Sequence, residues 1–473
     1  MSIDHSTPDL RRRSPSSSPQ NRGSPALPDE EVTARAKTSA KLYGVVTPDP
    51  AAVKAALSPK IHPYLTQPDL LVLDNLFYDV HDGNRGKPAT IDSKLSPETI
   101  EARADDTNIN TNHDATSISR LKALNNPNDA AFQPTVFVTW DAKDIPELIN
   151  HYIIRPHARL AMRIVRHPTD VVFLTHLLLY STVNLGSAMY MMFYHFTYLH
   201  GVAHAVYTLW CAGSFTLMMH NHIHNNGVLK KEWRWLDATF PCSPPLIPKP
   251  SSGPDDLSTT IRYQRDDVFH FLHYIGRFLL LIWAELPLYF YRKGKPNLAL
   301  RALVSELASY AFLYYMTALN PRAATFAFLI PFVQMRIGLM IGNWGQHALV
   351  DELEPDSDFR SSITLVDVPS NRFCFNDGYH TAHHLNPLRH WREQPVHFLQ
   401  SKEAYRDGRA LVFHNIDYLM LTFTLLRKDY LHLADSLVLM GEQIGMSREE
   451  VAEMLRSKTR QFSEEEIRVK FRS

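Results

Sequence analysis

Apolar and polar residues are distributed unevenly along this chain. From Val171 to Leu229 the sequence contains no Asp, Glu, Lys or Arg. A charge-free run of this length is long enough for two transmembrane helices of roughly 20 residues each. We expect the first helix over 171–194 and the second over 198–219. The link between them is very short, so the two helices should form a tight hairpin.

A second pair of apolar segments, 303–319 and 323–341, is joined by a short Asn-Pro-Arg link and predicts a second hairpin. Between the two pairs, residues 268–291 are also apolar but carry Arg277 and Glu285 near the middle. Because a charge in the centre of a span is costly, we expect this segment to lie in the membrane interface instead of crossing. All histidine-rich segments then lie on one side of the membrane.

The remaining regions are more polar. Residues 1–130 are rich in Pro, Ser, Asp and Asn, which predicts a disordered or irregular N-terminal region. Residues 131–400 hold the membrane domain, and 401–473 form a C-terminal helical segment. In that segment Ser447 and Glu450 predict a capping box that opens a helix. The predicted fold class is all-α: an integral membrane protein with two transmembrane helical hairpins and a cytosolic helical cap.

Composition narrows the choice of function. The formal net charge is zero, so bulk electrostatics gives no reason to expect a nucleic-acid partner. The three cysteines are widely separated and predict no disulfide framework. The 24 histidines are the unusual feature. Basic residues just before the first span favour the cytosolic side for that end of the helix: Arg155, Arg159, Arg163 and Arg166.

The histidines gather where apolar segments end. An H-x-x-x-H pair follows the second span, an Asn-x-x-x-His pair follows the last span, and an H-x-x-H-H box comes after that. Residues i, i+3 and i+4 share one face of a helix, so these imidazoles can converge on a metal. Imidazole suits zinc, copper, iron and nickel. His222 points to another face. The candidate metal ligands are His220, His224, Asn343, His347, His380, His383 and His384.

Over residues 171–400, two helical hairpins with histidine boxes in this order resemble the membrane fatty acid desaturase superfamily. The resemblance implies a di-iron centre held mainly by histidines on the cytosolic side of the membrane. It also implies that this membrane is that of the endoplasmic reticulum. It implies an oxidoreductase of lipid metabolism that uses dioxygen and two electrons to remove hydrogen from an acyl chain of an acyl-lipid or acyl-CoA. No amino acid side chain supplies that oxidising chemistry. Because the chain shows no haem motif and no nucleotide-binding motif, the electrons would come from a separate donor such as cytochrome b5.

The sequence departs from the family in one respect. In this family a middle H-x-x-H-H box is expected on the cytosolic face between the first hairpin and the interfacial segment 268–291. A proline-rich stretch, 241–250, occupies that interval instead, and no histidine occurs between His224 and His270. His270 and His273 could compensate only in a rearranged site. Either a coding segment is missing from this sequence or the box is genuinely lost, and in both cases we expect impaired activity of this chain.

Two other functions stay open from the sequence. The same boxes serve lipid hydroxylases of the same superfamily, and only the product distinguishes the two reactions. The absent box also fits a non-catalytic membrane pseudo-enzyme that binds lipid.

Overall fold

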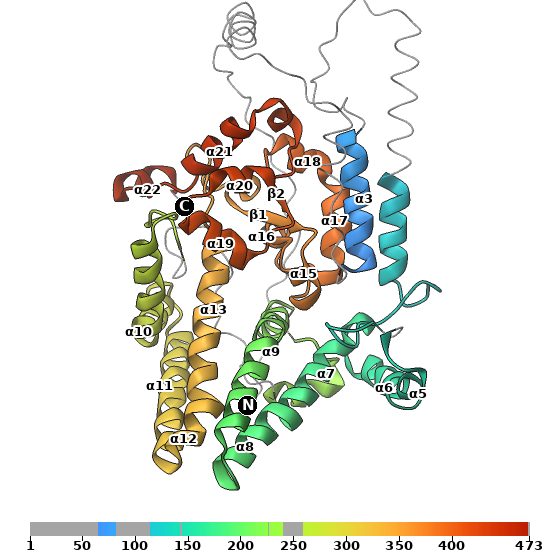
Figure 1. The fold of residues 1–473 in the computed structure, drawn as a ribbon, viewed down its shortest axis with the longest axis vertical. Coiled ribbons are helices and arrows are strands. Elements are labelled where there is room, and N and C mark those ends of the chain that lie inside the picture. Colours follow the sequence, from blue (N-terminus) through green and yellow to red (C-terminus); the bar gives the residue numbers. More distant parts are fainter. Residues whose placement is uncertain (1–64, 82–113, 142–143, 226, 240–258, 472–473) are drawn as a thin grey trace, which may run out of the picture. The chain divides into compact units, whose positions relative to one another are not determined.

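The computed structural model describes residues 65–81, 114–141, 144–225, 227–239 and 259–471, and the part of the chain it describes is mostly helical (Figure 1). Of the N-terminal region predicted to be disordered or irregular, residues 1–64 and 82–113 lie outside the described residues, as does the proline-rich stretch 241–250.

Five of the described helices are long and apolar enough to cross a membrane: Pro168–Phe193, Tyr198–His224, Val268–Arg292, Pro296–Leu319 and Pro321–Gln346. Three of them include the expected segments 198–219, 303–319 and 323–341, the helix Pro168–Phe193 covers the expected 171–194 except for its last residue, and the fifth is the segment expected in the interface. In the labels of Figure 1 they are formed by η3 (Pro168–Asp170), α7 (Val171–Leu179), η4 (Tyr180–Asn184) and α8 (Leu185–Phe193); α9 (Tyr198–His224); α10 (Val268–Arg292); α11 (Pro296–Leu319); and α12 (Pro321–Ala324), η6 (Thr325–Leu329) and α13 (Ile330–Gln346).

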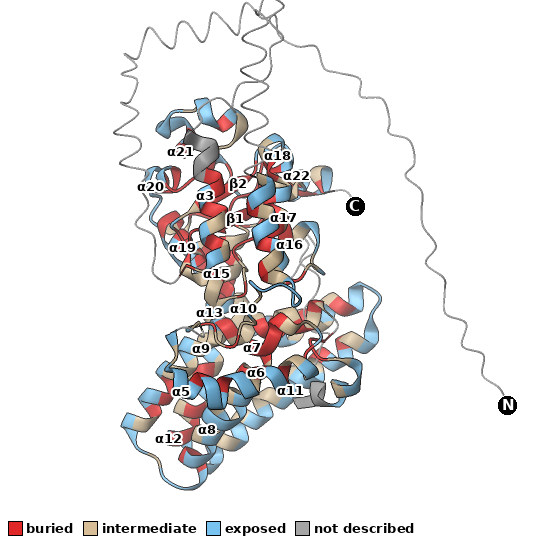
Figure 2. Cartoon of the chain, turned by 90° about the vertical axis from the view of Figure 1, so that its right-hand side faces the viewer, coloured by how far each residue is buried: buried red, intermediate tan, exposed pale blue. Residues whose placement is uncertain are grey.

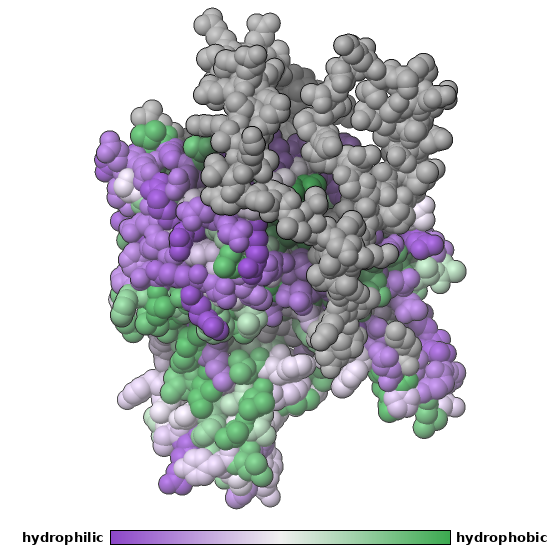
Figure 3. Space-filling model, turned by 45° about the horizontal axis from the view of Figure 1, so that its top comes forward, coloured by the Kyte–Doolittle hydropathy of each residue, from purple (hydrophilic) through white to green (hydrophobic). Residues whose placement is uncertain are grey.

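These helices expose most of their apolar surface. Only 6% of the most apolar window of α11 is buried, and 17% to 28% of the corresponding windows of the other four. Figure 3 shows hydrophobic residues covering the surface of this part of the molecule, whereas the part that carries the C-terminal elements is mainly hydrophilic. Monomeric soluble proteins rarely expose apolar patches of this extent, so the surface indicates a membrane protein.

The two charges inside α10 are bonded to each other. Arg277 Nε lies 2.7 Å from Glu285 Oε1, so neither charge is left without a partner on this apolar helix. Asp267 caps the start of α10 by accepting a hydrogen bond from the His270 amide, and Pro287 lies within the helix. The predicted helical conformation of this segment is confirmed.

A polar cap follows α13. Its elements are α14 (Asp358–Ser361), β1 (Ile363–Val366), α15 (Pro369–Phe373), α16 (His380–Leu385), η7 (Trp391–Glu393), α17 (Gln394–Gln400), α18 (Lys402–Asp407), β2 (Leu411–His414), α19 (Tyr418–Leu426), α20 (Tyr430–Asp435), η8 (Gly441–Gly445), α21 (Arg448–Ser457) and α22 (Glu464–Lys470). β1 and β2 pair in parallel, with Ile363 opposite Leu411. The all-α prediction missed this two-stranded sheet, because each strand has only four residues and shows no alternation of buried and exposed positions, so the usual strand signal is absent.

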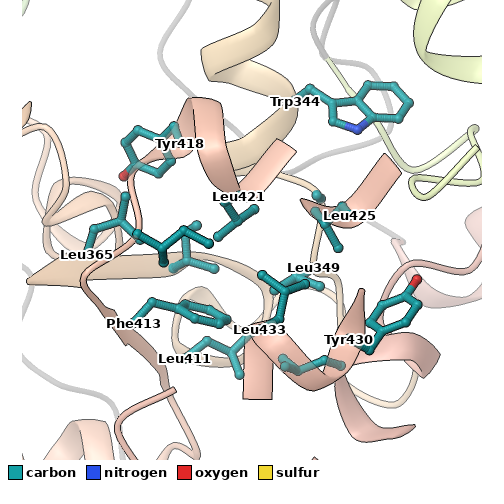
Figure 4. Packing of buried hydrophobic residues seen from close by; sticks show 14 of the residues in the cluster. Trp344, Leu349, Leu365, Leu411, Phe413, Tyr418, Leu421, Leu425, Tyr430 and Leu433 are labelled. Carbon is teal, nitrogen blue, oxygen red and sulfur yellow. The ribbon is translucent and has the colours of Figure 1, made fainter. Parts of the chain in front are cut away.

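The core of the cap also holds the end of α13. Trp344 is fully buried and packs with Leu365 from β1, Phe413 from β2 and Leu421 from α19 in one hydrophobic cluster (Figure 4). Its indole Nε1 donates a hydrogen bond to the Arg265 carbonyl oxygen at 3.1 Å. The last turn of α13 is therefore fixed in the core, and this turn leads directly into His347.

Some of the N-terminal region that was predicted to be irregular is helical. Helix α3 (Gln67–His81) and a helix over 114–125 lie within residues 1–130, and Val72 and Leu76 of α3 pack with Phe398 of α17. The remaining described helices are α5 (Glu147–Ile149), η2 (Asn150–Ile154), α6 (Arg155–Ile164) and η5 (Lys231–Thr239). The predicted capping box at Ser447 and Glu450 is confirmed, with both halves formed.

Candidate metal centre

The end of α9 brings two candidate ligands together. His220 and His224 lie one turn apart on the same face, with ring centroids separated by 4.4 Å. His222 lies on another face, as expected, and its Nδ1 accepts a hydrogen bond from the Val228 amide at 3.4 Å. The spacing of four residues thus selects the pair that can act together.

The H-x-x-H-H box forms the short helix α16, and the turn before it is fixed by a glycine. The amide of Gly378 donates to Asn371 Oδ1 at 3.0 Å, and its carbonyl oxygen accepts from the Leu365 amide at 2.7 Å. A Cβ at Gly378 would lie 2.1 Å from Asn371 Oδ1, so any other residue would displace this loop. The close approach orients His380, at the start of α16.

Six of the seven candidate ligands form two groups. Within each group the candidate ligand atoms lie within 4.8 Å of one another. We call His220, His224 and His383 the first group, and His347, His380 and His384 the second group. Helix α16 contributes to both, and the stacked rings of His380 and His383, 6.0 Å apart, connect them.

The spacing of the nitrogen atoms fits metal ligation. His220 Nε2 lies 3.3 Å from His383 Nε2 in the first group. In the second group, His380 Nε2 lies 3.2 Å from His347 Nε2 and 3.0 Å from His384 Nε2. Nitrogens held about 2.0–2.1 Å from one ion lie roughly 2.8–3.4 Å apart. These three distances fall within that range, and the candidate ligand atoms of each group all lie within 4.8 Å of one another, so each group could hold one metal ion.

Burial keeps these imidazoles neutral, which is the form that binds metal. Burial lowers the pKa of His347 to about 3, with a further contribution from His384. Burial likewise lowers the pKa of His383 to about 2. Neighbouring histidines lower it further, and His220 makes the largest of their contributions. The pKa of His380 is also lowered well below its usual value, mainly by burial. At neutral pH these three rings present lone pairs.

A carboxylate contacts one histidine of the second group. Asp358 Oδ1 lies 3.2 Å from His384 Nδ1, which assigns the proton to Nδ1 and leaves Nε2 of His384 as a lone pair toward the group. Ligating histidines are commonly oriented by such a partner. Sequence reasoning missed Asp358, because it lies 26 residues before His384 and no spacing rule connects the two.

A narrow cavity of about 20 Å³ adjoins the first group. It is lined by His220, His224, His383, Asp377 and Arg389, among others. Asp377 Oδ2 accepts a hydrogen bond from Gln346 Nε2 at 2.7 Å. Burial raises the pKa of Asp377 to about 7. This space is large enough for about one water-sized molecule.

Asn343 and the alternative histidines lie outside both groups. Asn343 lies one helical turn before His347. Its side-chain amide donates a hydrogen bond to the Tyr274 hydroxyl at 2.6 Å. His270 Nδ1 accepts from the Gln264 amide at 2.7 Å, and His273 Nδ1 lies 3.3 Å from the Tyr263 hydroxyl. Neither histidine takes the place of the absent middle box.

Comparison with known proteins gives no relative from which a function could be transferred. No family model, no curated protein and no solved structure matches this chain. Its assignment must therefore come from the residues themselves.

Proposed function

We propose that this chain is a membrane oxidoreductase similar to fatty acid desaturases, with two iron ions as its cofactor and an acyl chain as its substrate. One observation carries the proposal: six histidines from three separate stretches of sequence form two adjacent three-histidine groups at the ends of apolar helices. The comparisons with known proteins do not bear on it.

The helix contacts support two membrane hairpins with α10 in the interface. Helix α11 and the helix Pro321–Gln346 have 24 and 26 residues and are separated only by Asn320. Glu306 precedes Asn320 and Arg336 follows it by a similar number of residues. Arg336 Nη2 lies 2.6 Å from Glu306 Oε2, so the two helices run side by side in opposite directions. The start of α11 therefore belongs at the level of the end of α13.

Both ends of α10 belong at that same level. Its first turns pack on Trp344, with the ring centroids of Phe271 and Trp344 5.3 Å apart. Its last residue, Arg292, is followed after a short turn by α11. A helix that starts and ends at one level supports an interfacial position, with all histidines on one side of the membrane. The arginines before the first span favour the cytosol for that side, and by family resemblance the membrane is the endoplasmic reticulum.

The residues present could hold one ion in each group. Two irons bound there would supply the oxidising chemistry that attacks an unactivated methylene. Asp358 would keep the Nδ1 proton of His384 in place, and the apolar helices would cover the acyl chain. With three histidines per ion and no middle box, we expect lower turnover than a complete ligand set would give. A separate protein, such as cytochrome b5, would supply the electrons.

Metal content and lipid products together test the proposal. The full chain is purified in detergent, its iron is counted per chain, and the lipids of cells that express it are compared with those of cells expressing His380→Ala. About two irons and a new double bond absent from the His380→Ala cells would support it. Protein that binds no iron when offered ferrous ion under reducing conditions would overturn it.

The remaining outcomes identify the alternatives. A hydroxylated product would favour the lipid hydroxylase, and bound iron without any product would favour the pseudo-enzyme. Full turnover with two tightly bound irons would contradict the expected impairment. Sequencing the transcript across 240–251 would show whether a middle box has been omitted.

A further inference from the structure

A helix in front of the first membrane-length segment has three distinct faces. α5, η2 and α6 run without a break from Glu147 to Ile164. One face is buried against the domain through Ile154, Ala158 and Ala161, which pack with Val136 and Val171. Packing of this face holds the helix against the rest of the domain.

A second face is apolar and exposed. Ile153 and Leu160 are 60% and 58% exposed, and Ile149 one turn before Ile153 is 43% exposed. These positions repeat at i, i+4 and i+11, so they form one stripe along the helix. Figure 2 shows the exposed residues along α5 and α6. Nothing in the described part of the chain covers this stripe.

A third face is basic. Arg155, Arg159 and Arg163 are exposed and follow one another at intervals of four residues, and Arg166, also exposed, comes two residues after the helix ends at Ile164. Glu147 lies 3.0 Å from Arg155, which leaves the later three arginines as an excess of positive charge. An exposed apolar stripe beside an arginine stripe is the pattern of a helix that lies in a membrane surface.

The chain fixes the level of this helix relative to the apolar helices. The Arg166 amide donates to the Val228 carbonyl oxygen at 2.9 Å, and the Lys230 amide donates to the Ile164 carbonyl oxygen at 3.0 Å. Val228 and Lys230 lie four and six residues after His224, where α9 ends. The last turn of α6 therefore lies where α9 leaves the apolar layer, which is the depth of lipid headgroups.

We propose that the helix Glu147–Ile164 lies in the plane of the membrane on the histidine side and that its arginine stripe binds the headgroups of anionic lipids. The apolar stripe continues the exposed apolar surface of the membrane-length helices into the acyl-chain boundary, and the arginines meet phosphate groups beside it. This assignment depends on the membrane location of the chain and is independent of any metal.

The basic face is tested in nanodiscs that contain the full chain. Wild type and the variant Arg159→Gln/Arg163→Gln/Arg166→Gln are reconstituted with phosphatidylcholine containing a minor share of phosphatidylserine, and the lipid retained on the protein is measured by native mass spectrometry. Each arginine near an anionic surface contributes roughly a fivefold preference. We expect the triple variant to lose selective retention of phosphatidylserine by at least about tenfold.

A control with the same change of charge is available in the polar cap. Arg409, Arg448 and Arg468 are exposed there, and their triple replacement by Gln should leave phosphatidylserine retention unchanged. Equal retention by wild type and the α6 variant, or an equal loss in the control, would overturn the lipid assignment.

The apolar face is tested by photo-crosslinking. Benzoylphenylalanine placed at Ile153 should form adducts with lipid acyl chains in the same nanodiscs, whereas the same group at the buried Ala158 should crosslink within the protein. Adducts at Ile153 to a second copy of the chain or to another protein would show that the stripe is a protein interface and would overturn the proposal.

Discussion

The two histidine groups share α16 but are held in different ways. The first group takes two of its members from the end of α9 and lies beside the narrow cavity. The second group takes one member from just after α13 and has Asp358 behind His384. Near it, Trp344 anchors the last turn of α13 in the largest cluster of the cap.

The first group therefore has free space beside it, whereas the second group is held by more contacts with the protein. The first group adjoins space for about one water-sized molecule, lined by Asp377 and Arg389 among others. The second group is fixed by a carboxylate and by the buried end of a helix, so its nitrogens are preorganised. We infer that the first group is the open side of the centre and the second group its rigid side.

The largest effect should follow from removing one histidine of each group. In His383→Ala the first group keeps two imidazoles, and in His384→Ala the second group keeps two. Two ligands hold an ion much more weakly than three, so each variant should bind one metal instead of the two that we propose, with affinity at the altered group reduced by at least on the order of 100-fold. Metal per chain and separate titrations of each variant measure this.

The exposed His432 supplies a control. Its side chain lies on α20 in the cap, outside both groups, and His432→Ala should bind as much metal as wild type. Loss of both metals in His383→Ala and in His384→Ala alike would show that the two groups act as one site and would contradict the comparison.

The sequence predicted which histidines lie close together better than it predicted what surrounds them. The spacing in His220–His224 and in the H-x-x-H-H box is local, because a helix places i, i+3 and i+4 on one face. The division into two groups was not predictable, because it depends on which face of α16 meets α9 and which meets the turn after α13. Asp358 and Asp377 come from loops and short helices whose positions depend on packing in the cap.

The fold shows the same limit. The membrane-length helices follow from long apolar runs without charge, which few other structures tolerate. The four-residue strands around Leu365 and Phe413 carry no alternating pattern, so their pairing depends on residues about 48 positions apart in sequence. Such non-local pairing leaves no signal in a single sequence.

The second prediction concerns α9 and α13, the membrane-length helices that lead to the first and second histidine groups. α9 contains no Asp, Glu, Lys or Arg, whereas the α13 side is held by a largely buried ion pair between Arg336 and Glu306. Arg336 also lies 4.2 Å from the ring centroid of Phe332. Replacing one partner leaves an unpaired charge, so Arg336→Ala should destabilise the protein by about 3–5 kcal/mol. The thermal midpoint in detergent measures the loss.

Two further variants separate the charge pair from simple loss of an arginine. Arg322→Ala removes an exposed arginine at the other end of the same helix and should change the midpoint little. The double variant Arg336→Met/Glu306→Leu removes both charges and should recover most of the stability. A double variant as unstable as Arg336→Ala would mean that the pair does not act through its charge.

The third prediction concerns Asp358. In Asp358→Asn the side chain keeps its size but loses the charge that holds the Nδ1 proton of His384. Metal affinity of the second group should fall by roughly 10-fold to 100-fold while the first group is unchanged. Titration of the variant with one equivalent of metal should then fill the first group preferentially. Unchanged affinity at both positions would remove Asp358 from the centre.

The smallest effect concerns the pH dependence of the metal-free protein. Burial holds the pKa of His347 and of His383 far below the value of about 6.5 expected in the unfolded chain, so the folded state binds fewer protons than the unfolded state as pH falls below 6.5. This contribution to stability is present above pH 6.5 and is lost below it, by about 1.4 kcal/mol per pH unit for each histidine.

Asp377 acts in the opposite direction and allows this contribution to be isolated. Because burial raises its pKa to about 7, the folded protein keeps a proton that the unfolded chain releases, and this side chain opposes the loss between pH 6.5 and 5.5. The variant Asp377→Asn should therefore lose stability over this range more steeply than wild type, by about 1.4 kcal/mol per pH unit. Chemical denaturation of both metal-free proteins at pH 6.5 and 5.5 measures the difference. Equal slopes would mean that Asp377 is ionised beside the first group, and the open side of the centre would then carry a fixed negative charge.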